Sequence, residues 1–511
     1  MIKFNSQYEK KYTTFFGGSD NDNLYDIDYN LVNNSIYAIG NTYSTNIPIR
    51  PYSNPNNGTY YQSQGYGNWD NDVADAYILR FDLATTNGSP IWSSYIGGAG
   101  NDKAKSIVVA KTGDVAVGIT TSTNTGESSC IAPQSGGLSI CNGSNQYKGG
   151  NSDVYFIKFN YNNELIFSSF YGGNGSDDIQ DLCLGSSSII GVGSTSSTNF
   201  YTYPSGSYFV TDDCPNSIAG FIFDFGLNNQ MKWSTTIPYL SDIQTVDYRG
   251  NFTYIVGIPQ GTVYQGINTC SYDQNGISIC HDNGGHNQTQ VNGPDDIYIA
   301  CFNDKNLYWS TFYGGTTDEG SDFYDNTDLK LWRSKYIDCS ISDYNFYVMG
   351  ITSKLPGYSF PLLNYNGFYY DNYNNGSEGA SDVFFLGFDY GNELFWSTLF
   401  GGGDDNMTLV DYSSDFGGTM KVYNDNIYMT GWTYTPNYPD ACPGSGAYCQ
   451  LAPPQPNPSW PLGAVSTVSV FDLQNAPIGF NELTADNNSL CLFPNPSYDK
   501  VYIKSSIKIN K

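Results

Sequence analysis

The chain has 511 residues, with 22 Lys and Arg against 49 Asp and Glu, and so a formal net charge of −27. An acidic chain lacks the basic surface that nucleic acids and anionic membrane faces require, so neither is expected as a partner. No apolar run reaches the roughly 18 residues of a membrane helix, which argues against membrane insertion. Aromatic residues make up 16% of the chain and Gly occupies 55 positions, a composition typical of short strands joined by turns.

A seven-residue pattern recurs along the chain: an aromatic residue, two hydroxyl residues, two mostly large residues and a double glycine. It is found at 12–18, 92–98, 167–173, 309–315 and 396–402, with a degenerate copy at 233–239. Trp stands first in four copies, at positions 92, 233, 309 and 396. A residue placed by a repeat is expected to pack in a core, and repetition at this spacing predicts a repeat architecture.

Further strands accompany each copy of the pattern. One ends shortly before it, at 78–82, 156–160, 222–226, 299–303 and 385–389, and another follows it, at 36–40, 115–118, 190–193, 254–257, 347–350 and 427–431. With a weaker stretch between them, each unit supplies four short strands. Six such sheets in series must stack on one another, and radial stacking gives an all-β propeller of four-stranded blades.

Each unit is longer than a propeller blade needs, and the surplus lies in loops such as 46–75 and 356–381. Three close cysteine pairs fall in these loops: Cys130 with Cys141, Cys270 with Cys280, and Cys442 with Cys449. We predict disulfides, which persist in an oxidising compartment, in loops that project from one rim. The sequence assigns no pairing to Cys183, Cys214, Cys301, Cys339 and Cys491.

The order of the pattern at 309–315, the strand at 347–353 and the strand at 382–388 resembles the SBBP repeat. That bacterial family is expected to form a seven-bladed propeller, and the resemblance covers roughly residues 1–473. It implies architecture and no catalytic residues. The number of blades stays open between six and seven. Residues 1–5 align with the strand at 156–160, so the chain begins within a strand, and a seventh copy of that strand, at 468–472, is not followed by the seven-residue pattern.

The segment 492–503, with its Pro-Asn-Pro turn, looks like the start of the C-terminal sorting domain of the type IX secretion system of Bacteroidota. The resemblance implies a linker at 474–488 and an incomplete β-sandwich-type sorting domain at 489–511. It also implies the type IX machinery as a partner and a secreted or cell-surface location. We expect the chain to be a fragment whose signal peptide lay upstream.

Acidic turns follow the double glycines, and two interpretations stay open for them. Asp and Asn suit such turns because their side chains bond the local backbone. Carboxylates converging from successive blades would alternatively bind calcium, the one cofactor weighed here. The candidate ligands are Asp20, Asp22, Asp102, Asp177, Asp178, Asp318, Asp404 and Asp405.

Aromatic side chains are dense in the surplus loops, where they either cover the blade rim or form a recognition surface for flat sugar rings. The candidate contacts are Tyr60, Tyr61, Tyr66, Trp69, Phe368, Tyr369, Tyr370, Trp432 and Tyr434.

The chain has two histidines, His281 and His286, and His is the commonest general base. We therefore predict a non-catalytic binding or adhesion module for an extracellular polysaccharide or protein. The alternatives are a secreted carbohydrate-active hydrolase or lyase, and a structural spacer of a larger surface protein.

Overall fold

The computed structural model describes residues 1–473 with gaps. The longer gaps are 320–337, 402–414 and 434–464, and the shorter ones are 7, 53–57, 85–87, 134, 144–146, 207, 209, 211–217, 261–264, 272, 274–275, 282–284, 294–295, 317–318, 343–344, 354–358, 373–380 and 425. The predicted linker and sorting domain at 474–511 lie outside the described residues.

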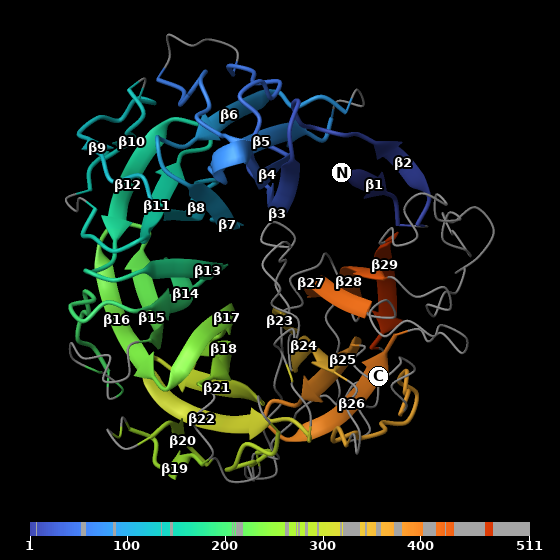
Figure 1. The fold of residues 1–511 in the computed structure, drawn as a ribbon. Coiled ribbons are helices and arrows are strands. Elements are labelled where there is room, and N and C mark those ends of the chain that lie inside the picture. The colour runs from blue at the N-terminus through green and yellow to red at the C-terminus, as the bar shows by residue number, and fades with distance from the viewer. Residues whose placement is uncertain are drawn as a thin grey trace, which may run out of the picture.

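Most of the described strands form six antiparallel sheets arranged around a central axis, as Figure 1 shows. Two short parallel pairs lie in the loops, β9 (Gly126–Glu127) with β10 (Leu138–Ser139) and β19 (Ile267–Asn268) with β20 (Ser278–Ile279). Blade 1 contains β3 (Asp22–Asn30), β4 (Ser35–Thr42), β5 (Asp75–Asp82) and β6 (Trp92–Ile96). Blade 2 contains β7 (Asp102–Val109), β8 (Val115–Thr121), β11 (Asp153–Phe159) and β12 (Leu165–Tyr171). Blade 3 contains β13 (Asp177–Leu184), β14 (Ser188–Thr195), β15 (Ala219–Gly226) and β16 (Met231–Pro238).

Blade 4 contains β17 (Leu240–Arg249), β18 (Phe252–Pro259), β21 (Ile297–Asn303) and β22 (Asn306–Tyr313). Blade 5 contains β23 (Asp338–Ile341), β24 (Phe346–Ser353), β25 (Ser381–Phe388) and β26 (Leu394–Phe400). Blade 6 has three described strands, β27 (Asp415–Tyr423), β28 (Asn426–Thr433) and β29 (Val465–Asp472). The predicted all-β propeller is therefore confirmed.

The first strand of each blade is the innermost, and the fourth strand of blades 1 to 5 is the outermost (Figure 1). The repeated aromatic residue opens or lies within the outermost strand and points into the core between sheets. Trp92, Trp309 and Trp396 are no more than 1% exposed, which confirms their prediction as core anchors. Stacked sheets bury both faces of most strands in this way, whereas β3 keeps Leu24 and Ile27 exposed.

A two-stranded sheet, β1 (Ile2–Phe4) with β2 (Lys10–Thr13), lies in the ring between blade 1 and blade 6 (Figure 1). Met1 and Phe16 pack against the cluster of blade 1 that includes Tyr77. The ring therefore has six blades together with this extra pair of strands.

The described parts of the surplus loops leave the ring at one face. Those of blades 1, 3 and 5 run along the outermost strand of their own blade. Loop residues Arg50, Tyr203 and Leu363 form bridges to Ser93, Ser234 and Ser397 of those strands. An outermost strand otherwise presents a row of unpaired N–H and C=O groups. The loops satisfy part of that edge.

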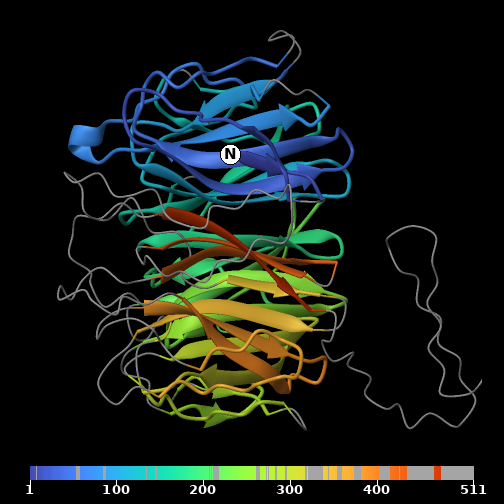
Figure 2. The same ribbon diagram turned by 90° about the vertical axis from the view of Figure 1, so that its right-hand side faces the viewer.

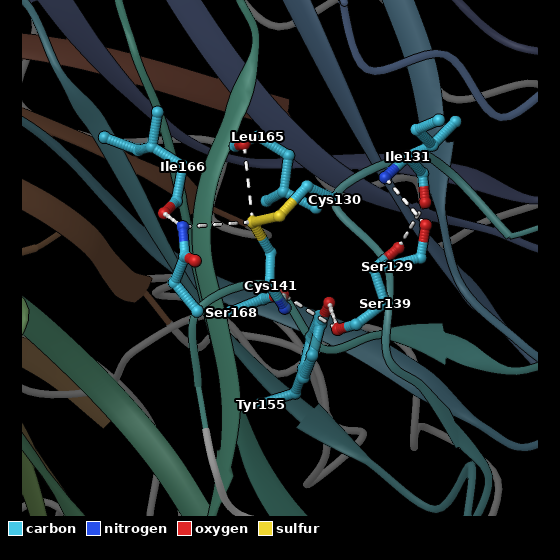
Figure 3. Close-up of a disulfide and its surroundings, with 10 residues drawn as sticks. Ser129, Cys130, Ile131, Ser139, Cys141, Tyr155, Leu165, Ile166 and Ser168 are labelled. Carbon is cyan, nitrogen blue, oxygen red and sulfur yellow. Dashed lines mark hydrogen bonds between the residues drawn. A yellow bond between two sulfur atoms is a disulfide. The ribbon is translucent and has the colours of Figure 1, made fainter.

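Two of the three predicted disulfides are present, Cys130–Cys141 and Cys270–Cys280. The third predicted pair, Cys442 and Cys449, lies outside the described residues. In Figure 3, Cys141 lies beside the outermost strand of blade 2, where its carbonyl accepts a hydrogen bond from the N–H of Ser168 at 2.9 Å. Cys280 bonds Ser310 of blade 4 in the same way at 2.9 Å. Both disulfides thus secure a loop against an outer edge.

Candidate functional site

One face of the ring carries both the double-glycine turns and the long loops, and we call it the loop face. Because consecutive strands of a blade are antiparallel, its second and fourth strands both end at the same face of the ring. The double-glycine turn follows the fourth strand and the long loop follows the second, so both lie at that face. Figure 2 shows the short 3₁₀ turn η2 (Trp69–Asn71) on this face, with the strands edge-on. The predicted calcium ligands and aromatic contacts belong to it.

In four of the five double-glycine copies, a carboxylate four residues after the second glycine accepts a hydrogen bond from its N–H. The fifth copy, at 401–402, lies partly outside the described residues. The N–H of Gly98 donates to Asp102 at 2.6 Å, and the N–H of Gly173 donates to Asp177 at 2.7 Å. The hydroxyls of Thr121 and Thr195, from the second strands of the same blades, also donate to these carboxylates. Asp22 and Glu319 have matching partners in blade 1 and blade 5.

A second carboxylate meets the first at three junctions between blades. A Cβ added to Gly172 would lie 2.6 Å from Asp177 Oδ2 and closer still to Asp153 Oδ1. The corresponding pairs are Asp75 with Asp102 beside Gly97, and Asp296 with Glu319 beside Gly314. Glycine is therefore required at these three positions, because carboxylate oxygens fill the place that a side chain would occupy.

Burial raises the pKa of the four carboxyl groups at the first two of these junctions, Asp75, Asp102, Asp153 and Asp177. It raises the pKa of Asp75 to about 8, with a further contribution from the charge of Asp102. It raises the pKa of Asp153 to about 7, with a further contribution from Asp177. Asp75 Oδ1 and Asp153 Oδ1 are buried without a hydrogen-bond donor. A proton on the carboxyl group with the raised pKa would supply the missing donor and remove the repulsion between the two groups.

The predicted calcium ligands do not gather at one point. Asp22, Asp102 and Asp177 each lie in a different blade and accept the hydrogen bonds described above, while Asp178 accepts one from the hydroxyl of Ser152 at 3.0 Å. Asp20 is exposed on the loop face. Asp318, Asp404 and Asp405 lie outside the described residues. Among the described residues, no three His, Cys, Asp or Glu side chains are grouped as metal ligands.

The predicted aromatic contacts separate into buried and exposed side chains. Tyr60 and Phe368 are 1% and 9% exposed and belong to hydrophobic clusters of the core. Their prediction as ligand contacts is therefore corrected: these rings seal the docked loops against the blades. Trp69 and Tyr369 are 47% and 37% exposed. Tyr61, Tyr66 and Tyr370 are half-buried. Tyr434 and the side chain of Trp432 lie outside what the structure describes.

Trp69 is the most exposed of these rings, and its surroundings hold it in place. Tyr43 packs edge-on against its indole, with ring centroids 5.0 Å apart, and donates a hydrogen bond to Asp72 at 2.8 Å. The side chain of Asn68 caps the short turn by accepting from the N–H of Asn71 at 3.2 Å. An indole face beside carboxylate and amide groups is an arrangement that can stack on a sugar ring and bond its hydroxyls.

A row of carboxylates and hydroxyls, which sequence reasoning did not single out, lines the innermost strands. Ser106 Oγ lies 3.2 Å from Asp26 and 3.0 Å from Asp181, and Thr245 Oγ1 lies 2.9 Å from Asp181 and 3.0 Å from Asp338. The same carboxylates accept backbone N–H bonds from neighbouring blades. The sequence signal is weak: Asp26, Ser106 and Asp181 each lie four positions after the start of their strand, but Thr245 and Asp338 do not share this position. That is too little to predict a row.

No protein-family model matches the chain, and no curated protein matches it in sequence. The similar solved structures include a Synechocystis apocarotenoid oxygenase at 8% identity and TM-score 0.28, covering 82% of this chain and 89% of that chain. They also include B. megaterium levansucrase at 10% identity and TM-score 0.29, covering 80% and 90%. A GH43_1 enzyme from Xanthomonas citri has 7% identity and TM-score 0.24, covering 66% and 82%. Values this low transfer no activity, substrate or cofactor to this chain.

Proposed function

We propose that the protein is an extracellular binding module that attaches to a polysaccharide through its loop face, without catalysis. The exposed Trp69, held by Tyr43 and flanked by polar side chains, is the observation that carries the proposal. The two disulfides support an oxidising environment. The described residues contain no helix long and apolar enough to cross a membrane. Export by the type IX machinery and display at the cell surface belong to the same proposal, on the resemblance of 492–503.

Glycan-array binding tests the proposal, followed by titration of the best polysaccharide. Because aromatic anchors dominate the energetics of binding surfaces, Trp69→Ala is expected to weaken binding at least about tenfold. Tyr161→Ala is the matched control: Tyr161 is 49% exposed but lies in a turn on the opposite face. Equal affinity of both variants would contradict the proposal. Binding to a protein ligand and to none of the sugars would replace the polysaccharide with the protein alternative.

The row of Asp26, Asp181 and Asp338 is the observation that favours the second candidate, a carbohydrate-active hydrolase or lyase. Pairs of carboxylates perform such hydrolysis. The candidate predicts release of sugar fragments by the intact chain and its loss in Asp181→Asn. An undiminished polysaccharide after prolonged incubation would eliminate it.

Calcium at the loop-face carboxylates is a separate proposal, supported by the oxygen-rich turns around Asp20, Asp22 and Asp178. It predicts a lower melting temperature after chelation, restored by adding back calcium. An unchanged melting temperature would remove calcium from the account.

A further inference from the structure

Three junctions between blades are filled, on the face opposite the loops, by an Asn side chain from a turn. Asn163 accepts hydrogen bonds from the hydroxyl of Tyr37 at 2.7 Å and from Arg80 at 3.3 Å. Asn229 accepts from Lys158 at 2.6 Å, and Asn392 accepts from the hydroxyl of Tyr254 at 2.8 Å. All three Asn residues have φ between 60° and 66°, the left-handed conformation that Asn tolerates.

The junction between blades 3 and 4 has no such residue. The turns that supply Asn have five residues between the flanking strand pairs, at 160–164, 226–230 and 389–393, whereas the turn of blade 4 has four, at 303–306. Its centre is Asp304–Lys305, with φ of 43° and 71°. Two successive non-glycine residues in this conformation cost free energy, a feature that is frequent at functional sites.

A cavity of about 150 Å³ lies at this junction, lined by Asp224, Trp233, Lys232, Lys305, Tyr248 and Thr253 among others. Asp224 occupies the position that Arg80 and Lys158 hold in blades 1 and 2, opposite the first residue of the repeated pattern. Arg80 and Lys158 each donate a hydrogen bond to the Asn that fills their junction, whereas Asp224 lines the cavity.

Two polar atoms of the cavity lining, Asp224 Oδ1 and Trp233 Nε1, are buried without a hydrogen-bond partner among the residues that the structure describes. The equivalent indole nitrogens are satisfied, since Trp92, Trp309 and Trp396 donate to loop carbonyls at 2.8–3.0 Å. A buried donor and a buried acceptor left unpaired each cost free energy that a ligand can recover.

We propose that this cavity binds a small zwitterion, a free α-amino acid of about six to eight non-hydrogen atoms. A cavity of this volume holds a molecule the size of benzene. The ammonium group donates to Asp224 Oδ1, and the carboxylate accepts from Trp233 Nε1 beside Lys232 and Lys305. The lining contains two lysines, Lys232 and Lys305, and two aspartates, Asp224 and Asp304, so its formal net charge is zero. A ligand with one positive and one negative group has the same balance of charge.

Calorimetric titration of the full chain with L-alanine and L-serine tests the site, with acetate and methylammonium as half-ligands. We expect an amino acid to bind saturably. Acetate and methylammonium should each bind at least about tenfold more weakly, because each can pair with only one of Asp224 Oδ1 and Trp233 Nε1. The absence of binding by both amino acids overturns the proposal, and so does acetate binding as tightly as alanine.

Variants place the binding in the cavity. Asp224→Asn and Trp233→Phe are each expected to lower the affinity at least about tenfold, whereas Trp92→Phe, whose indole nitrogen bonds a loop carbonyl, is expected to leave it unchanged. Replacing 303–306 with the sequence of 160–164 supplies an Asn and should abolish binding while raising the melting temperature. This last variant keeps the test decisive if Trp233→Phe fails to fold. Undiminished affinity in Asp224→Asn and in the turn replacement overturns the proposal.

Discussion

The junction between blades 2 and 3 and the junction between blades 3 and 4 join similar sheets by different means. At the first, Asp153 and Asp177 meet beside Gly172 on the loop face, and Lys158 reaches Asn229 on the opposite face. At the second, the degenerate copy at 233–239 has no double glycine, Tyr239 alone separates β16 from β17, and no Asn fills the opposite face.

The comparison distinguishes the apolar packing that brings neighbouring blades together from the polar contacts at the two faces of each junction. Both junctions bury a continuous apolar core, including Phe223 and Phe225 at the first and Ile237 and Ile243 at the second. Hydrophobic stacking is therefore sufficient for neighbouring blades to pack. The polar contacts fill the two ends of each interface, and where they are missing at blades 3 and 4, a cavity with unpaired polar atoms is left.

The largest expected effect comes from removing a filling Asn. Asn163→Ala removes the acceptor of the Tyr37 hydroxyl and one of the acceptors of Arg80, and it places Ala at a φ of 65°. We expect a loss of about 3–4 kcal/mol in the free energy of unfolding, measured by chemical denaturation. Lys305→Ala, at the junction that lacks the Asn, is the control and should cost less than about 1 kcal/mol. Equal losses of unfolding free energy in the two variants would contradict the claim that the Asn side chain stabilises its junction.

Opening a disulfide tests how the loops are secured. In the chain-entropy view, closing the loop between Cys130 and Cys141 contributes about 2.5–3 kcal/mol. Replacing both with Ser should lower the melting temperature and increase proteolytic cleavage of the loop. A reducing agent should lower the melting temperature of the parent chain more than that of this variant. If the reductant affects both to the same degree, the disulfide does not secure the loop.

Gly172→Ala tests the carboxylate pair directly. The added methyl group would lie 2.6 Å from Asp177 Oδ2, and overpacking of this kind costs about 1–3 kcal/mol. Gly391→Ala is the control, because its Cβ would meet a single atom, Asp389 Oδ1, at 3.3 Å. A Gly172 variant as stable as the control would show that the pair does not occupy this space.

The smallest expected effect is a dependence of stability on pH. The pKa values of Asp75 and Asp153 are raised in the folded chain to about 8 and about 7, above the ordinary value of about 3.9 in the unfolded chain. Between these limits the folded state holds more protons, so the free energy of unfolding falls as pH rises from about 4 to 8.

The double variant Asp75→Asn with Asp153→Asn should flatten this slope, because an amide N–H replaces the carboxyl proton. Asp20→Asn with Asp178→Asn changes the net charge equally and should leave the slope in place. Melting temperatures from pH 5 to 8 distinguish the two, and parallel profiles would argue against protonation of Asp75 and Asp153.

The sequence was sufficient to predict the blades, because the spacing of Trp92, Trp309 and Trp396 and the alternation around them are local signals of a repeat. It also predicted two disulfides from cysteine spacing. It could not predict that Tyr60 and Phe368 are buried, because the loops that carry them dock on strands distant in the sequence. The row of Asp26, Asp181 and Asp338 was missed for the same reason: its members meet only when the ring closes.

Hydrogen exchange at the turns opposite the loop face tests the difference between the junctions most directly. The N–H groups of Asn163, Asn229 and Asn392 are bonded within turns whose side chains fill a junction. The N–H of Asp304 donates to the carbonyl of Asn251 at 3.1 Å, so Lys305 provides the contrast. We expect the three Asn N–H groups to exchange at least about tenfold more slowly than the N–H group of Lys305 in the ligand-free chain. Equal protection of all four turns would contradict the account, because the junction between blades 3 and 4 would then be fastened like the others.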